Sequence, residues 1–220
     1  NFLIFYGNSL DSVGREVDMI RLIEVQESEQ SKKINMTIEN GQMLCVTGMR
    51  RNSLLRMIGG LNTPYSGHIE INNCDLTSMD EQARAIFRRR YLSYIYKDNN
   101  LIDFLTVRDN INIINNLDGK TTNDYLFSDI MNYMSVIYNS LDAYPAEMDT
   151  LQQFCIALAR GVVSNHSIIL IEDLEMMKNM RYIEDYLGIL KNLNHKKNIT
   201  MILSMINNHY LSLFDKIFLF

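Results

Sequence analysis

The chain has 220 residues, of which 47% are hydrophobic and 21% are charged, and its formal net charge at pH 7 is −5. This is ordinary globular composition with enough apolar residues for a sizeable core, so it excludes a disordered tail and a fibre. The acidic balance disfavours nucleic acid as a partner, because phosphate binding needs a basic surface. No apolar run approaches the roughly 20 residues that span a bilayer, so we expect a soluble chain whose membrane contact is indirect.

Hydrophobic periodicity predicts alternating strands and helices along the chain. The predicted strands lie at 21–25, 34–38, 43–46, 68–72, 91–96, 168–171, 200–205 and from 216, and the predicted helices at 52–61, 80–90, 107–117, 124–137, 147–163, 181–193 and 210–214. The bare aliphatic runs at 43–46 and 168–171 are typical of parallel strands that are buried on both faces. The alternation therefore predicts an α/β fold in which helices pack on a mostly parallel sheet.

Three cysteines, Cys45, Cys74 and Cys155, show no metal-ligand spacing, and this fits a reduced, cytoplasmic compartment. With two prolines, no Trp and many Asn, Ile, Met and Tyr residues, the composition is similar to that of low-GC bacteria. The chain lacks an initiator Met and ends inside an apolar run at 217–220. We therefore expect a piece of a longer protein.

Several motifs occur in a fixed order along the chain. The sequence reads Gly-Gly-Leu-Asn-Thr-Pro-Tyr-Ser-Gly at 59–67, Phe-Arg-Arg-Arg at 87–90, Leu-Thr-Val-Arg-Asp-Asn at 105–110, Tyr-Pro-Ala-Glu at 144–147 and Ala-Leu-Ala-Arg at 157–160. This ordered set resembles the nucleotide-binding domain of an ATP-binding-cassette (ABC) transporter, in the subfamily of lipoprotein-release, macrolide-export and cell-division ATPases. The resemblance covers about residues 19–220 and implies a P-loop cassette with a parallel core sheet, a small antiparallel subdomain and a helical subdomain near 98–163. Residues 1–18 would be an extension or the tail of a preceding segment.

The phosphate-binding loop departs from the family pattern. An intact P-loop reads G-x-x-x-x-G-K-[ST], since backbone N–H groups wrap the phosphates, the Lys reaches the outer phosphates and the hydroxyl holds magnesium. The matching run is about three residues shorter and lacks the inner glycines: it reads Gly48-Met49-Arg50-Arg51-Asn52-Ser53. The resemblance places Arg51 at the Lys position and Asn52 and Ser53 at the hydroxyl positions. Arg51 either pairs with a phosphate or belongs to a solvated loop.

The acidic pair after the strand at 168–171 is reversed, because the family has Asp-Glu where this chain has Glu172-Asp173. The resemblance implies a magnesium shell around Glu172 and Ser53, and a water-activating role for Asp173, which is one methylene short for that task. The alternative is a polar strand end that is solvated at the edge of the sheet. We expect ATP and Mg²⁺ to bind weakly or not at all.

The remaining nucleotide-contacting positions are also altered. The signature motif, whose serine and glycines contact phosphate in the opposite subunit, falls on the run that includes Asp149, Thr150 and Gln152, and these residues also read as an ordinary helix cap. The Q-loop glutamine falls on Lys97 and the switch histidine on Ile206. The aromatic residue that stacks on adenine in the family falls near Glu29, and the D-loop aspartate falls near Asn179.

These departures indicate a pseudo-ATPase, and the resemblance implies a subunit on the cytoplasmic face of the inner membrane. The resemblance implies an integral-membrane permease and a second, competent ATPase as partners. Apolar residues are available for permease docking, although they could equally pack inside the helical subdomain: Leu101, Ile102, Phe104 and Leu105. Two other functions stay open, a slow ATPase that uses Arg51, Ser53, Glu172 and Asp173 with magnesium, and a scaffold or regulatory protein without a transporter.

Overall fold

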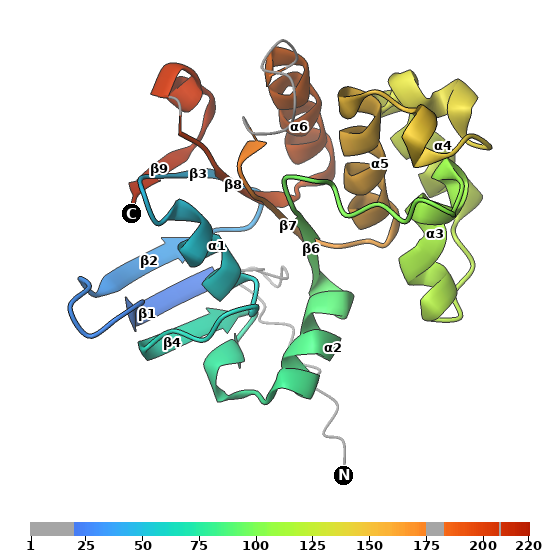
Figure 1. Cartoon of the computed structure of the whole chain (residues 1–220). Helices are drawn as coiled ribbons and strands as arrows, with labels where there is room; N and C mark the ends of the chain where they lie inside the picture. The colour runs from blue at the N-terminus through green and yellow to red at the C-terminus, as the bar shows by residue number, and fades with distance from the viewer. Residues whose placement is uncertain (1–19, 175–182, 207) are drawn as a thin grey trace, which may run out of the picture.

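Figure 1 shows the computed structural model of the chain, which describes residues 20–174, 183–206 and 208–220. Its strands are β1 (Ile20–Gln26), β2 (Ile34–Ile38), β3 (Met43–Thr47), β4 (Ser66–Ile71), β5 (Cys74–Asp75), β6 (Leu92–Ile95), β7 (Ile168–Ile171), β8 (Thr200–Ser204) and β9 (Lys216–Leu219). Its α-helices are α1 (Arg51–Ile58), α2 (Glu81–Tyr91), α3 (Val107–Leu117), α4 (Asp124–Tyr133), α5 (Thr150–Val163) and α6 (Ile183–Lys197). Short 3-10 helices are η1 (Leu76–Ser78), η2 (Ser135–Ser140), η3 (Pro145–Glu147) and η6 (Asn208–Leu213). Within the described ranges, none of the helices combines the length and apolar character that crossing a membrane requires.

Five parallel strands form the central sheet in the order β6-β7-β8-β3-β9. Every residue of β3, β7 and β8 is buried, as expected for parallel strands whose two faces are both covered. The register is level across these strands, with Val46 opposite Ser204 and Ile171 opposite Leu203. The carboxyl ends of β3, β7 and β8 therefore meet at one edge of the sheet.

A second sheet is antiparallel and has the order β2-β1-β4-β5. Ile20 of β1 lies opposite Ile38 on one neighbour and Ile71 on the other, and all three side chains are buried. Burial alternates along β2, which is the pattern of a sheet with one face against the core.

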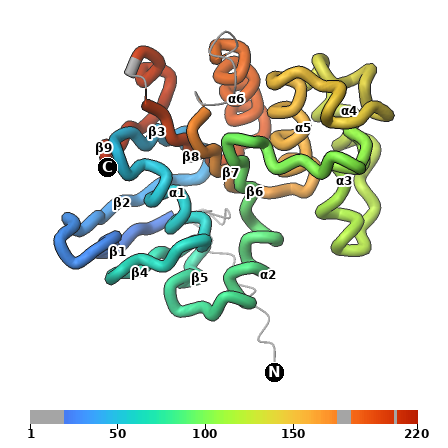
Figure 2. The backbone as a smooth tube through the Cα atoms, viewed as in Figure 1, coloured from blue at the N-terminus to red at the C-terminus, as the bar shows by residue number. Residues whose placement is uncertain are grey.

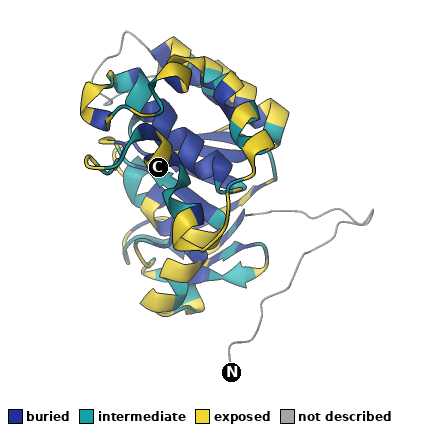
Figure 3. Cartoon of the chain, turned by 90° about the vertical axis from the view of Figure 1, so that its right-hand side faces the viewer, coloured by how far each residue is buried: buried dark blue, intermediate teal, exposed yellow. Residues whose placement is uncertain are grey.

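Two apolar cores lie on the two faces of the parallel sheet. Leu44 and Val46 of β3 belong to the core shared with α1 and the antiparallel sheet, whereas Met43 and Cys45 belong to the core shared with α5 and α6. This division follows from the alternation of side chains along a strand. Figure 2 shows α3, α4 and α5 grouped beyond the β6 side of the parallel sheet, away from the antiparallel sheet, and Figure 3 shows the buried residues enclosed by these layers.

The fold class and the order of elements predicted from the sequence are confirmed. Several boundaries differ. The helix expected at 52–61 ends at Ile58, the helix expected at 124–137 divides into α4 and η2, and the helix expected from 147 is preceded by η3 and starts at Thr150. The helix expected at 181–193 continues to Lys197, with residues 181–182 outside the described residues, the helix expected at 210–214 is the 3-10 helix η6, and β5 was not predicted. Pro145 begins η3 and Asp149 caps α5, so the chain turns between the two. The domain limits at 18 and at 98–163 stay predictions, and residues 1–18 lie outside the described residues.

Candidate functional site

The candidate site lies at the carboxyl edge of the parallel sheet, where α/β proteins commonly place their binding sites. Only three residues, Gly48, Met49 and Arg50, connect the end of β3 to the start of α1. Gly48 has φ +103°, a backbone conformation that favours glycine, and a Cβ there would lie 2.0 Å from the carbonyl oxygen of Phe220. Arg50 donates its backbone N–H to the same oxygen at 3.4 Å, and its guanidinium lies over the Phe220 ring and pairs with Glu27. The connection is therefore packed against the protein's own chain.

Arg51, the first residue of α1, is turned inward. Its Nε and one terminal nitrogen lie 2.9 and 2.8 Å from Oδ1 of Asp173, and its other terminal nitrogen donates to the carbonyl of Gly48 at 2.9 Å. The two side chains are only 15% and 12% exposed. The interpretation of Arg51 as part of a solvated loop is wrong, because the acidic residue after β7 holds its guanidinium inside the site.

A closed ring of hydrogen bonds surrounds the same carboxylate. Asn52 donates its side-chain amide to Oδ2 of Asp173 at 2.6 Å, and the hydroxyl of Ser204 donates to the Asn52 carbonyl oxygen at 2.6 Å. The backbone N–H of Asp173 completes the ring by donating to the Ser204 hydroxyl oxygen at 2.7 Å. The ring joins α1 to the ends of β7 and β8, and it satisfies both carboxylate oxygens of Asp173 together with Arg51.

Glu172 is buried and has its own arginine. Arg56, one turn after Arg51 on α1, donates to Oε1 of Glu172 at 2.6 Å, and the hydroxyl of Tyr94 lies 3.4 Å from Oε2. Burial alone would lower the pKa of Arg56, but the hydrogen bond and charge of Glu172 outweigh it and raise this pKa. Burial, reinforced by the Glu172 charge, raises the pKa of Tyr94. The interpretation of the acidic pair as a solvated strand end is also wrong, because the side chains of Asp173 and Glu172 are only 12% and 4% exposed and each is paired with an arginine of α1.

A cavity of about 260 Å³ opens beside these pairs. Its lining residues come from α1, the segment after β6 and the end of β7: Asn52, Arg56, Tyr96, Lys97, Asp98, Asn100, Glu172 and Asp173. Arg160 of α5 stabilises the segment after β6. Its side chain is buried and donates hydrogen bonds to the backbone carbonyls of Asn99 and Asn100. Lys97, at the Q-loop position, is exposed at the cavity rim.

The signature-like residues lie elsewhere, at the start of α5 on the helical side of Figure 1. Asp149 accepts the backbone N–H of Gln152 at 2.8 Å, and the Gln152 side chain accepts the backbone N–H of Asp149 at 3.0 Å. This reciprocal pair is a capping box, so Asp149 does cap the helix and Thr150 follows as its first residue.

The structure thus brings together Gly48, Arg51, Asn52, Glu172 and Asp173, with Lys97 at the cavity rim, and Ser53 follows in the first turn of α1. Ile206 is exposed beyond β8, Glu29 is exposed between β1 and β2, and Asn179 lies outside the described residues.

Three contributors were missed by sequence reasoning: Tyr94, Arg56 and Ser204. Arg56 had a detectable signal, since it is a charged residue between the buried Leu55 and Met57 of α1. Ser204 is the polar residue that ends β8, after the apolar run Met201, Ile202 and Leu203.

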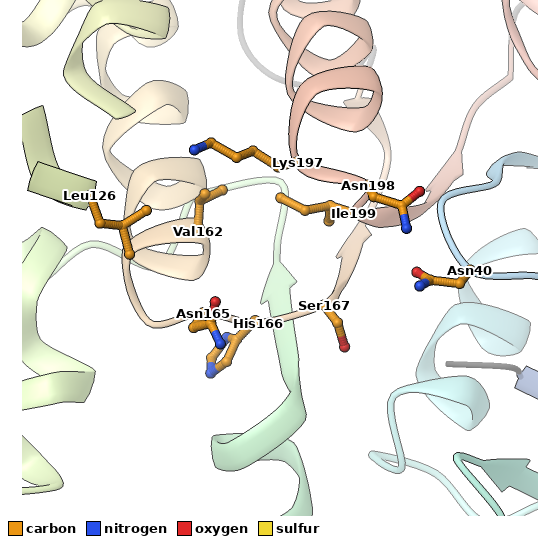
Figure 4. Close-up of a pocket in the computed structure, with 9 residues that line it drawn as sticks. All are labelled: Asn40, Leu126, Val162, Asn165, His166, Ser167, Lys197, Asn198 and Ile199. Atoms are coloured by element: carbon orange, nitrogen blue, oxygen red, sulfur yellow. The ribbon is translucent and has the colours of Figure 1, made fainter. Parts of the chain in front are cut away.

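A second cavity, of about 240 Å³, lies at the opposite, amino-terminal end of β7 and β8 (Figure 4). It is lined by Asn40, Leu126, Val162, Asn165, His166, Ser167, Lys197, Asn198 and Ile199. His166 is buried and its Nε2 lies 3.1 Å from the carbonyl oxygen of Arg89, which can only accept, so Nε2 carries the proton. Among the described residues nothing hydrogen-bonds Nδ1 of this ring. The cavity shares no residue with the candidate site.

Comparison with known proteins finds relatives among transporter ATP-binding proteins. The bacitracin export ATP-binding protein BceA of Halalkalibacterium halodurans is 27% identical over 186 residues, which cover 82% of this chain and 73% of that protein. The ABC transporter ATP-binding protein YtrE of Bacillus subtilis is 26% identical over 177 residues, covering 78% of this chain and 76% of the relative.

Solved structures share the fold at lower identity. The ATP-binding cassette MJ0796, described as a dimer in a post-hydrolysis state bound to ADP and Pi, has a TM-score of 0.76 at 19% identity and covers 91% of this chain and 93% of its own. The cbiO1 protein of Clostridium perfringens, described as part of the ABC transporter complex cbiONQ, has a TM-score of 0.80 at 16% identity and covers 93% of this chain and 85% of its own.

The sequence profile of the family described as "ABC transporter" matches residues 31–173, which is more than half of the chain. The matched stretch runs from the loop before β2 to the acidic pair after β7, and so includes α1, the helical group and the candidate site except Ser204. The chain therefore belongs to the ABC transporter family and folds as its ATP-binding domain.

Proposed function

We propose that this chain is a degenerate nucleotide-binding subunit of a bacterial ABC-type membrane complex, at the cytoplasmic face of the inner membrane. In this proposal it docks a permease and pairs with a competent ATPase, while hydrolysing little or no ATP itself. The single observation that carries the proposal is the engagement of Arg51, at the P-loop lysine position, by Asp173 and the Gly48 carbonyl.

The residues present do not fit a magnesium-bound triphosphate. A P-loop encloses phosphates with successive backbone N–H groups, whereas the three-residue connection before α1 packs against Phe220. A phosphate would also need the guanidinium of Arg51, which an internal carboxylate already holds at 2.8 Å. No catalytic step is therefore assigned to a nucleotide at this site.

Pairing with a second ATPase follows from the composite sites that the family resemblance implies, in which the signature motif of one subunit completes the P-loop site of the other. At the signature position this chain has a capping box, with the carboxylate of Asp149 turned onto its own helix. A homodimer would contain two such altered sites. A heterodimer leaves the partner's own P-loop intact, which supports a heteromeric assembly.

Permease docking is supported by the segment after the candidate site. Phe104 is 81% exposed, whereas Leu101 packs against the core of the helical side. The predicted docking residues are therefore divided between packing inside the subdomain and an outward-facing aromatic ring, which suits a helix-in-groove contact.

The hydrolysis test compares phosphate release by the purified chain and by its Glu172→Gln variant, in ATP with Mg²⁺. Glu70→Gln is the matched control, because Glu70 also pairs with an arginine at 2.6 Å but lies in the antiparallel sheet. We expect all three proteins to release phosphate at the same background rate. Hydrolysis that is present in the wild type and control but lost in Glu172→Gln would instead establish the slow ATPase.

The docking test is affinity capture from detergent-solubilised native membranes followed by mass spectrometry. Phe104→Asp is compared with Tyr125→Asp, since the two aromatic side chains are 81% and 82% exposed and Tyr125 lies on α4. We expect a permease and a second ATPase with the wild type and with Tyr125→Asp, and loss of the permease with Phe104→Asp. Capture without any membrane partner would favour the scaffold function.

A further inference from the structure

We infer that the guanidinium groups of Arg51 and Arg56 replace the divalent cation at this site, so that Glu172 and Asp173 hold no metal. This inference rests on the proposed function, because it concerns the same site. It goes further by specifying how the two carboxylates are neutralised.

The charges balance within the site. Each carboxylate of the acidic pair has one arginine of α1 as its partner, Asp173 with Arg51 at 2.8 Å and Glu172 with Arg56 at 2.6 Å. Two carboxylates this well enclosed need two compensating positive charges, because an unpaired buried charge is strongly unfavourable. A divalent cation would supply the same charge, and the two guanidinium groups supply it here.

Each carboxylate oxygen of the pair already has a hydrogen-bond donor beside it. Oδ1 of Asp173 accepts two N–H groups of Arg51, and Oδ2 accepts the amide of Asn52. Oε1 of Glu172 accepts from Arg56, which leaves Oε2 beside the Tyr94 hydroxyl. Magnesium needs near-octahedral oxygen ligands at about 2.0–2.1 Å, so an ion at Oδ1 of Asp173 or Oε1 of Glu172 would have to displace an arginine. Displacing the arginines would leave their two guanidinium groups next to the metal ion without carboxylate partners.

The packing of α1 holds Arg56 where its guanidinium can take the place of a cation beside Glu172. Arg56 is flanked on α1 by the buried Leu55 and Met57, so its backbone is fixed while its side chain, 46% exposed, reaches across to Glu172. It also lines the 260 Å³ cavity, where the exposed Lys97 adds a further positive charge at the rim. The exposed carboxylate of Asp98 also lines this cavity, so the exclusion of a metal ion rests on the two arginine pairs and not on the charge of the rim.

The test measures Mn²⁺ binding by the loss of the free-ion electron paramagnetic resonance signal, in the absence of nucleotide. Arg56→Gln frees Glu172, and Arg21→Gln is the matched control, since Arg21 pairs with Glu70 at 2.6 Å and is 40% exposed. We expect the wild type and Arg21→Gln to bind Mn²⁺ equally weakly, and Arg56→Gln to bind at least about tenfold more tightly, because a nearby positive charge is removed. The gain should vanish in the double variant Arg56→Gln/Glu172→Gln.

Wild-type Mn²⁺ binding that is lost in Glu172→Gln or Asp173→Asn would overturn the inference. A folded Arg56→Gln variant that gains no affinity would also overturn it. If Arg56→Gln does not fold, the inference is tested by comparing Mn²⁺ binding of the wild type with that of Asp173→Asn. Metal binding at this site without ATP hydrolysis would overturn this inference and leave the proposed function standing. ATP hydrolysis that persists in EDTA would overturn the proposed function and leave this inference standing.

Discussion

Arg51 and Asp173 are 122 positions apart in the chain, yet the guanidinium of one and the carboxylate of the other meet at 2.8 Å in a largely buried ion pair. Arg51 begins the helix that follows β3, and Asp173 follows the end of β7. The pair therefore fixes the amino-terminal end of α1 to the carboxyl edge of the central sheet, at the place where the family resemblance implies a bound phosphate.

Removing the cation of this pair should destabilise the fold. In Arg51→Met the carboxylate of Asp173 stays enclosed without its partner, and we expect a loss of about 3–5 kcal/mol in the free energy of unfolding. Urea denaturation at neutral pH measures it. The double variant Arg51→Met/Asp173→Asn should recover most of the loss, because the amide carries no charge. A single-variant loss below about 1 kcal/mol would show that the pair is solvated.

The hydrogen-bonded ring predicts a smaller effect at Ser204. In Ser204→Ala the backbone N–H of Asp173 and the side-chain oxygen of Asn52 both lose the fully buried hydroxyl that partners them, which should cost about 1–3 kcal/mol. Ser78→Ala is the control, because its exposed hydroxyl donates to the Asp75 carbonyl at 2.8 Å. Equal stability of the two variants would contradict the ring.

Local patterns were sufficient to predict an α/β fold with a mostly parallel sheet, whereas the cassette architecture followed from the family resemblance. The runs at 43–46 and 168–171 are uninterrupted and apolar, and such runs indicate parallel strands buried on both faces. The capping of α5 by Asp149 was also predictable, since a cap and its partner are three residues apart.

The contacts of the site were predictable only in part. Family resemblance placed Arg51, Asn52 and Asp173 in one site, but the choice of partner depends on how α1 sits against two strands more than a hundred residues away. Glu172 could have faced solvent or magnesium, and no local pattern links it to Arg56, which lies 116 positions earlier. Such pairings are decided by tertiary packing.

The capping box at Asp149 gives a third prediction. Asp149→Ala removes the acceptor for the Gln152 N–H and should cost about 1 kcal/mol of stability, whereas Asp149→Ser should retain most of it. Thermal unfolding of the three proteins, followed by circular dichroism, measures the difference. Asp142→Ala serves as the control, because this aspartate is 97% exposed and lies 3.9 Å from Arg108. If Asp149→Ala were as stable as the wild type, the carboxylate of Asp149 would not contribute to stability as a helix cap.

Burial of His166 predicts how stability depends on pH. Burial lowers the pKa of this imidazole and outweighs the hydrogen bond to the Arg89 carbonyl, which raises it. The unfolded chain binds a proton near pH 6.5, whereas the folded chain resists protonation until lower pH. Stability is therefore unaffected above about pH 6.5, falls as the pH decreases below that value, and levels off once the folded imidazole also titrates.

Urea denaturation at pH 7.5, 6.5 and 5.5 tests this dependence. The Gln side chain in His166→Gln can still donate to the Arg89 carbonyl but does not titrate, so its curve should be flatter below pH 6.5 than that of the wild type. His195→Gln is the control, since it makes the same substitution at a histidine that is exposed near the end of α6. Parallel curves for the wild type and His166→Gln would mean that other groups set the acid sensitivity. The imidazole of His166 would then have to accept a proton in the folded state as readily as in the unfolded chain, which the enclosed ring and its single carbonyl partner oppose.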